Sequence, residues 1–212
     1  MRLPTFNDLW YSDPNHKHGE NIQPEYAHSF EAIVKYQTSQ LQAHLSYFLM
    51  KGSNLLDWVK FAPTETLFTS HNISELTNQG IEASLTLRLG QYLPLLGDGS
   101  KLSLDYLYMT QRHHAPRVAV SKYALNYLRH KFTTQLSHQL SKRIEALWAL
   151  RYQDRVNQPS PFATLDLKVD YLVNQHLRVG LEMNNLTDTQ YSDIAGVPQP
   201  GFWLSGNISY RL

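Results

Sequence analysis

The sequence predicts an all-β protein, an antiparallel, up-and-down transmembrane β-barrel segment of about nine strands. Apolar and polar residues alternate with a period of two along most of the chain, which is typical of strands with one apolar and one polar face. The connections between these segments alternate between short and long, and aromatic residues recur at both ends of the apolar face. Together these observations favour a barrel wall in a membrane, with tight turns at one rim and long loops at the other.

The composition excludes several other classes of protein. The 212 residues include 19 Lys and Arg and 18 Asp and Glu, and the resulting net charge of +1 argues against a nucleic-acid partner. The absence of cysteine excludes disulfide scaffolds, thiolate metal sites and cysteine nucleophiles. No apolar run approaches the roughly 18 residues of a transmembrane helix, and no catalytic or phosphate-binding motif occurs. We therefore expect neither an enzyme nor a resident cofactor or metal ion.

In chain order, the pattern predicts one helical turn near Phe6 to Tyr11 and strands thereafter. The clearest strand contains Ile81 to Leu89, where every odd position is apolar and every even position is polar. The expected strands span 25–37, 41–59, 68–90, 101–112, 121–138, 143–154, 162–172, 176–187 and 200–212.

The connections predict an orientation. Short connections are expected at 37–40, 138–142 and 172–175, an intermediate one at 90–100, and long ones at 60–70, 112–121, 154–161 and 187–200. In an outer-membrane barrel the tight turns face the periplasm and the long loops face outward. With the chain end in the periplasm, the long connections and residues 1–24 lie outside the cell, where a rigid barrel would hold them for binding.

Each predicted strand has one face toward lipid and one toward the barrel lumen. The charged residues expected on the lumen face are Glu31, Lys35, Glu82, Arg88, Asp105, Asp166, Lys168, Asp170, Arg178 and Glu182. Such residues could guide a polar solute, but they more often form salt bridges with neighbouring strands or a plug. The aromatic residues expected at the two membrane boundaries are Tyr36, Tyr152, Tyr171, Phe202 and Tyr210.

Two other classes of protein remain open at this stage. A soluble β-barrel or sandwich that binds a small apolar ligand shows the same alternation, but its apolar face packs against a second layer. A structural barrel or adhesin-like translocator would carry a linker helix ahead of about 12 strands, and the sequence shows no such helix.

Several motifs, in a fixed order, resemble those of TonB-dependent outer-membrane receptors. Arg2 to Trp10 (RLPTFNDLW) is similar to an arginine–x–proline–Ser/Thr segment of these barrels, and Asn21 to Glu25 (NIQPE) to a strand start. Asn78 to Glu82 (NQGIE) matches another strand opening. Asn185 to Asp188 (NLTD), followed by Tyr191, Pro200-Gly201 and an aromatic-rich final strand, matches the closing segment. The spacing is most similar to that of vitamin B12 receptors and ferric-chelate receptors.

The resemblance implies a 22-strand barrel, preceded by a plug domain and a TonB box. Residues 1–212 would then be the C-terminal part of the barrel domain, without plug, TonB box or signal peptide. It further implies import of scarce metal chelates (cobalamin, siderophore or haem) across the bacterial outer membrane. We expect the chain not to transport by itself, because it would reach TonB only through the missing N-terminal region.

The partners expected from the resemblance are outer-membrane lipid, the metal-chelate ligand and the barrel-assembly machinery. The assembly machinery would recognise the C-terminal strand through Phe202, Leu204, Ile208, Tyr210 and Leu212. The last residue is Leu where the family usually has Phe, which could weaken that recognition.

The candidate ligand contacts lie on the predicted outer loops. They are His16, His18, His71, His113 and His114, together with Trp58 at the outer end of a strand. Histidine is the commonest transition-metal ligand, and Trp58 could stack on a ligand ring. The alternative is a set of solvated histidines and an aromatic anchor at the membrane boundary, because no metal-ligand spacing connects them.

Overall fold

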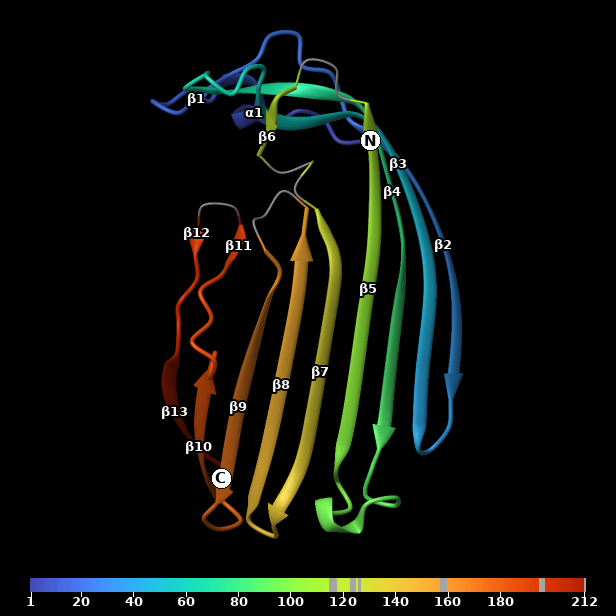
Figure 1. Cartoon of the computed structure of the whole chain (residues 1–212), viewed down its shortest axis with the longest axis vertical. Helices are drawn as coiled ribbons and strands as arrows, with labels where there is room; N and C mark the ends of the chain where they lie inside the picture. Colours follow the sequence, from blue (N-terminus) through green and yellow to red (C-terminus); the bar gives the residue numbers. More distant parts are fainter. Residues whose placement is uncertain (115–117, 123–124, 126, 157–159, 195–196, 212) are drawn as a thin grey trace.

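The computed structural model describes residues 1–114, 118–122, 125, 127–156, 160–194 and 197–211. Nine strands form one antiparallel sheet in the order β2-β3-β4-β5-β7-β8-β9-β10-β13, so each long strand pairs with the next along the chain (Figure 1). The two edge strands, β2 and β13, do not pair with each other, and the sheet is therefore open. This arrangement confirms the predicted class, a partial up-and-down barrel.

The observed strand bounds follow the predicted ones closely. The nine strands are β2 (Tyr26–Gln37), β3 (Leu41–Lys60), β4 (Phe68–Arg88), β5 (Lys101–His114), β7 (Leu128–Ser141), β8 (Ile144–Arg155), β9 (Phe162–Leu172), β10 (Leu177–Asn184) and β13 (Trp203–Tyr210). Period-two alternation predicted these segments well because one face of each strand is apolar over most of its length.

Three strand predictions need correction. The strand expected over 121–138 is two elements: β6 (Val120–Ser121) pairs with the end of β3, and β7 begins only at Leu128. The strand expected over 176–187 ends at Asn184, because Asn185 has a φ of 51° and turns the chain away. The final strand begins at Trp203, so Phe202 precedes it, and Leu212 lies outside the described residues.

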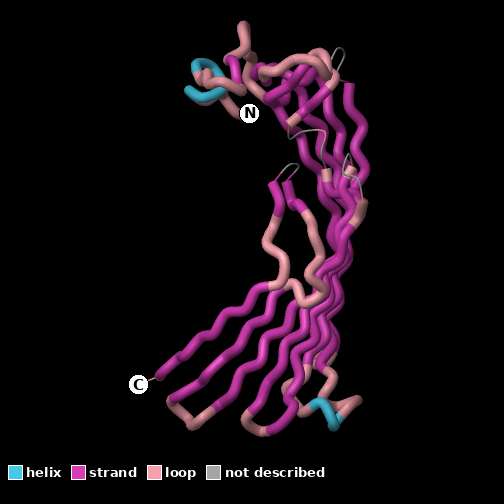
Figure 2. Tube along the Cα trace, turned by 60° about the vertical axis from the view of Figure 1, so that its left-hand side comes forward, coloured by secondary structure: helices cyan, strands magenta, loops and turns pink. Residues whose placement is uncertain are grey.

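The sheet is a single curved layer (Figure 2). Most of the large apolar residues on one face are exposed or half-buried; Val34, Leu45 and Ile208, for example, are exposed. Among the residues with defined positions, no second layer covers this face. The soluble sandwich therefore finds no support, since its apolar face requires a packing partner.

Beyond the top of the sheet, the chain forms a compact region that we call the outer lobe. It comprises residues 1–24, the ends of β3 and β4 (52–76 with their connection) and β6 (Figures 1 and 2). β3 and β4 have 20 and 21 residues, about twice what a membrane crossing requires, so both continue well past it. β1 (His16–Lys17) adds a short parallel pairing with β4. Val59, Ile73 and Leu76 are buried here.

The predicted helical turn is the helix α1 (Phe6–Trp10), which begins at a capping box. The backbone N–H of Asp8 donates to the Thr5 hydroxyl, and the backbone N–H of Thr5 donates to the Asp8 carboxylate. The sequence did not predict the 3-10 helix η1 (Pro94–Leu96) or the small hairpin of β11 (Ser192–Ile194) and β12 (Val197–Pro198). Neither α1 nor η1 is long enough to cross a membrane.

Candidate ligand-binding site

The first two sequence motifs meet in the outer lobe. Arg2 and Glu25 exchange two backbone hydrogen bonds of 2.9 Å, and the Arg2 guanidinium binds the Glu25 carboxylate at 2.6 and 3.2 Å. The Oε1 atom of that carboxylate also accepts from the backbone N–H of Leu56 at 2.6 Å. The hydrogen bond to Glu25, partly offset by burial, raises the pKa of Arg2. This pair fixes the start of the chain beside the end of β3.

Residues 1–24 are attached to β4 by hydrogen bonds to two polar side chains, Ser70 and Asn72. Ser70, which is buried, donates its hydroxyl to the carbonyl of Asp8 and accepts from the backbone N–H of Gly19. A Cβ at Gly19 would lie 1.9 Å from the carbonyl oxygen of Ser70, so only glycine allows this approach. Asn72 exchanges hydrogen bonds with the backbone of Gln23 at 2.8 and 3.0 Å. The N-terminal segment is thus part of the outer wall of the lobe.

An aromatic cluster with cations lies at the centre of the lobe. The ring of Trp58 contacts His16 edge to face with a centroid separation of 5.0 Å, and His16 lies over Phe68 at 6.0 Å. The ammonium groups of Lys60 and Lys122 lie 4.6 and 5.6 Å from the Phe68 ring centroid. The structure therefore brings together two of the six candidate ligand contacts, His16 and Trp58.

The hydrogen bonds of His16 indicate which ring nitrogen donates. The Lys122 ammonium can only donate, so Nε2 of His16 accepts at 2.8 Å and the ring proton resides on Nδ1. Nδ1 in turn donates to the Asp13 carboxylate at 2.9 Å. Burial alone would raise the pKa of Asp13, but hydrogen bonds from Tyr11, Asn15 and His16 lower it to about 2. Both ring nitrogens of His16 are thus engaged within the lobe rather than directed at a metal ion.

The remaining candidate histidines lie apart from one another. Three of them were predicted to lie in loops, but the structure places them in strands. His71 lies within β4, where it contacts the Phe61 ring at 5.1 Å and where burial lowers its pKa. His113 and His114 are the last residues of β5, paired with Leu76 and Glu75. The ring centroids of His18 and Trp10 lie 6.3 Å apart. Across the described ranges, no three of His, Asp and Glu approach closely enough to hold a metal ion.

A small cavity of about 210 Å³ lies beneath this cluster. Its walls include Arg2, Asp8, Asp57, Trp58 and Ser70. Asp57 is buried, accepting from the hydroxyl of Ser121 and from the backbone N–H of Trp58 at 2.7 Å. Sequence analysis did not select Asp57 or Ser121, because they are 64 positions apart and the pairing of β6 with β3 brings them together.

All ten charged residues predicted for the lumen share one face of the sheet. The cross-strand register aligns them in rows, such as Lys168 with Glu182 and Asp170 with Glu145. Near the end of the sheet with the short turns, Arg178 lies 3.8 Å from Asp170 and 4.0 Å from Glu145, and Lys168 lies 3.7 Å from Asp170. These pairs are partly exposed and form the kind of ladder that the sequence suggests.

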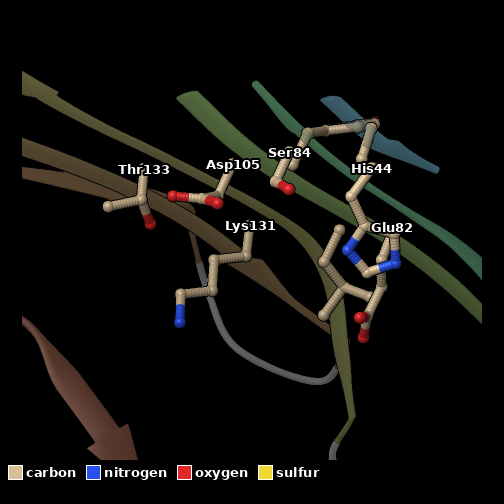
Figure 3. Close-up of a pocket in the computed structure, with 9 residues that line it drawn as sticks. His44, Glu82, Ser84, Asp105, Lys131 and Thr133 are labelled. Carbon is tan, nitrogen blue, oxygen red and sulfur yellow. The ribbon is translucent and has the colours of Figure 1, made fainter. Parts of the chain in front are cut away.

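A shallow depression of about 440 Å³ occupies the middle of this face. It spans four neighbouring strands, β3, β4, β5 and β7, and its charged and polar lining consists of His44, Glu82, Ser84, Asp105, Lys131 and Thr133 (Figure 3). Within the described part of the chain, the Nε2 atom of His44 is buried without a hydrogen-bond partner. Since buried polar groups normally have partners, this nitrogen can form one further hydrogen bond on this face.

Arg151 is a functional candidate that sequence analysis missed. It lies on the same face as the lumen residues, donates to the Tyr191 hydroxyl at 3.0 Å, and lies 3.7 Å from the Asp193 carboxylate. Its guanidinium lies over the rings of Phe162 and Tyr191, which stack 4.5 Å apart. Its place in a regular alternating strand did not indicate these contacts, which come from Phe162 of β9 and from Tyr191 and Asp193 near the β11–β12 hairpin.

The closing motif forms a hydrogen-bonded loop. Asn185 is buried; its side chain accepts from the backbone N–H of Thr189 and donates to the carbonyls of Thr189 and Pro200. Its own N–H donates to Asp166 at 2.7 Å. The Asp188 carboxylate accepts from the N–H of Phe202. The motif therefore sets the turn between β10 and the final strand.

The predicted boundary aromatics lie on the opposite, apolar face. Tyr36, Tyr152, Tyr171, Phe202 and Tyr210 are all exposed. In the final strand, Leu204, Ile208 and Tyr210 share this face and are likewise exposed. Their contact with lipid and with the assembly machinery stays a prediction.

Comparison with known proteins gives a consistent result. A family profile described as "TonB dependent receptor-like, beta-barrel" matches residues 1–186, whereas no curated protein sequence matches the chain. The solved structure of the copper transporter OprC is 14% identical with a TM-score of 0.71, covering 99% of this chain and 35% of that one. The ferric enterobactin receptor PfeA from Pseudomonas aeruginosa is 19% identical with a TM-score of 0.65, covering 92% and 32%.

The FrpB iron transporter from Neisseria meningitidis is also similar, at 17% identity with a TM-score of 0.68, covering 92% of this chain and 33% of that one. At these identities the likeness concerns the fold. The chain spans about a third of the length of each of these three proteins.

Proposed function

This chain belongs to the TonB-dependent receptor β-barrel family, and we propose that it forms the C-terminal part of the barrel of an outer-membrane receptor that imports a scarce metal chelate. The family consists of transporters and receptors rather than enzymes. The observation that carries the proposal is a single curved sheet with an exposed apolar outer face and a polar inner face, continuous with a folded outer lobe.

In this proposal the outer lobe contributes to capture of the ligand. Its accessible chemistry consists of cations and aromatic rings: Lys60 and Lys122 beside Phe68, with Trp58 at the cavity. Because both nitrogens of His16 are engaged, the lobe would recognise the organic shell of a chelate rather than the metal ion directly. Siderophore, haem and cobalamin all present such a shell.

The lumen wall provides the next part of the route. The depression lined by His44, Glu82, Asp105 and Lys131 offers donors and acceptors of both signs, which suits contact with a plug or with a passing polar solute. Movement of the plug would be coupled to TonB and the proton gradient, as the family resemblance implies. The final strand would serve as the signal for the barrel-assembly machinery.

Uptake by cells that produce the full receptor tests the proposal. Cells deprived of iron, copper or cobalamin are supplied with ferric siderophores, haem, a copper complex or cobalamin, and accumulation is compared with a strain lacking the receptor. We expect accumulation of one chelate, abolished when TonB is deleted. Absence of receptor-dependent accumulation for every chelate in the panel would contradict the proposal.

Variants then locate the site. Trp58→Ala should weaken whole-cell binding of that chelate, because it removes the ring beside the cavity. His176→Ala, at the opposite end of the sheet, is the matched control and should leave binding unchanged. Equal binding by both variants would exclude the outer lobe as the capture site.

A further inference from the structure

Three basic side chains form one row on the apolar face of the sheet. The register aligns His28 of β2 with Lys51 of β3, Lys51 with Thr77 of β4, and Thr77 with Arg112 of β5. Lys51 is six residues from Leu45, so the two side chains share a face, and the pairing places the whole row on that face. His28, Lys51 and Arg112 are all exposed.

The row lies at the edge of the apolar surface. The adjoining row on the same face is mixed, with Phe30, Leu49, Gln79 and Thr110. The row after it is apolar or aromatic throughout, with Ala32, Tyr47, Ile81 and Tyr108. From Leu41 to Lys51 the strand rises about 33 Å, and a tilt of about 40° converts this to a height of about 25 Å. That height equals the apolar band of an outer-membrane barrel, so the basic row begins where the hydrocarbon ends.

The charges in this row are not neutralised by the protein. Across the described part of the chain, Lys51 and Arg112 take part in no salt bridge, whereas Arg2, Arg151 and Arg178 all do. The row itself contains no carboxylate, and the nearest acidic position on the face is Glu75, in the adjoining row with Ser53 and His114. Three basic groups and the Thr77 hydroxyl thus face outward together above an aromatic belt.

We propose that His28, Lys51 and Arg112 bind the phosphate groups of a phosphorylated lipid in the outer leaflet, with its acyl chains lying on Phe30, Tyr47 and Tyr108. Cations at a membrane boundary attract anionic headgroups, and a guanidinium matches the geometry of a phosphate. A soluble anion would gain nothing from the apolar surface directly below, so that surface favours a lipid. The inference rests on the membrane orientation proposed above.

Native mass spectrometry of the full receptor in detergent tests this. Diphosphoryl lipid A and phosphatidylcholine, which is zwitterionic, are titrated separately. We expect the receptor to retain lipid A more tightly than phosphatidylcholine. Lys51→Gln and Arg112→Gln should each weaken lipid A binding about fivefold, and the double variant about 25-fold, while Lys51→Arg keeps it.

The controls separate this inference from the proposed function. Lys168→Gln with Arg178→Gln removes two cations from the opposite face and should leave lipid binding unchanged, and circular dichroism confirms that each variant is folded. Equal retention of both lipids, or full lipid A binding by the double variant, would overturn the lipid site alone. Failure to retain either lipid would instead contradict the membrane orientation.

Discussion

In the outer lobe Val59, Ile73 and Leu76 are at most 3% exposed, whereas in the sheet Phe30, Val34 and Ile208 are 60–76% exposed. The residue types are the same in both regions, so hydrophobicity alone does not explain the difference. Burial of an aliphatic side chain contributes about 1.5–3 kcal/mol. The lobe gains this from protein contacts, and in the proposed membrane orientation the sheet would gain it from lipid. The comparison teaches that one chain is built for two solvents.

Truncation of an isoleucine in each region has the largest expected effect. Ile73→Ala should destabilise the outer lobe by about 2–5 kcal/mol, because a cavity forms in a packed core. Ile208→Ala should cost only the transfer free energy of the removed carbons, about 2 kcal/mol, because lipid chains fill the space and no cavity forms. Denaturant unfolding in lipid vesicles, followed by tryptophan fluorescence, measures both. Equal losses would show that the two regions share one kind of core.

Introduction of a charge compares the two regions at positions whose side chains are similarly exposed. Leu45 on the sheet is 52% exposed and Leu3 in the lobe is 63% exposed. Leu45→Arg should cost about 2–4 kcal/mol in a bilayer, whereas Leu3→Arg at a water-exposed position should change stability by less than about 0.5 kcal/mol. Refolding yield into vesicles and the unfolding free energy report the difference. A tolerated Leu45→Arg would argue that water covers the apolar face.

A smaller effect is expected from the contact that attaches the chain start to the lobe. Arg2→Gln removes the ion pair with Glu25. The Arg2 side chain is half exposed, so solvent screens this ion pair. We expect a loss of about 1 kcal/mol, confined to the lobe. Limited proteolysis after Lys17 should become faster while cleavage elsewhere is unaffected. If proteolysis became faster along the whole chain, the contact would stabilise the entire protein and not only the lobe.

The smallest effect is a dependence on pH. The lowered pKa of Asp13 stabilises the folded lobe above the ordinary pKa of aspartate, about 3.9, and this contribution is lost as the pH falls through about 2. Proteolysis of residues 1–24 by pepsin should therefore accelerate between these values. Asp13→Asn should lack this acceleration in the same window. A transition of unchanged size in that variant would assign it to another carboxylate.

The strands could be predicted from the sequence because alternation is a local property. Two neighbouring residues on a strand face opposite media, and a row such as Ile81, Ala83 and Leu85 shows this directly. Gly80, in the third motif, is recognisable from the local sequence, but the need for glycine there comes from tertiary packing. A Cβ at Gly80 would lie 2.2 Å from the carbonyl oxygen of Tyr108, beside the Phe48 ring.

The candidate site was less predictable because its contacts cross long sequence distances. The hydrogen bond between Ser121 and Asp57 forms because β6 pairs with β3. The ion pair between Arg2 and Glu25 forms because their two segments meet in an isolated β-bridge. The early end of β10 has the same origin, since Asn185 keeps its left-handed conformation through hydrogen bonds to Asp166, Thr189 and Pro200. The alternation of apolar and polar residues along a strand does not predict such long-range contacts.

Site-directed labelling within the bilayer tests the central claim most directly. The chain has no cysteine, so single substitutions carry one fluorophore each: Leu45→Cys and Tyr106→Cys on the apolar face, His44→Cys and Asp105→Cys on the polar face. With the receptor in vesicles whose lipid chains carry a quencher, we expect quenching at 45 and 106 and none at 44 and 105. Quenching that is equal on both faces, or stronger at 44 and 105, would contradict a lipid-facing apolar surface.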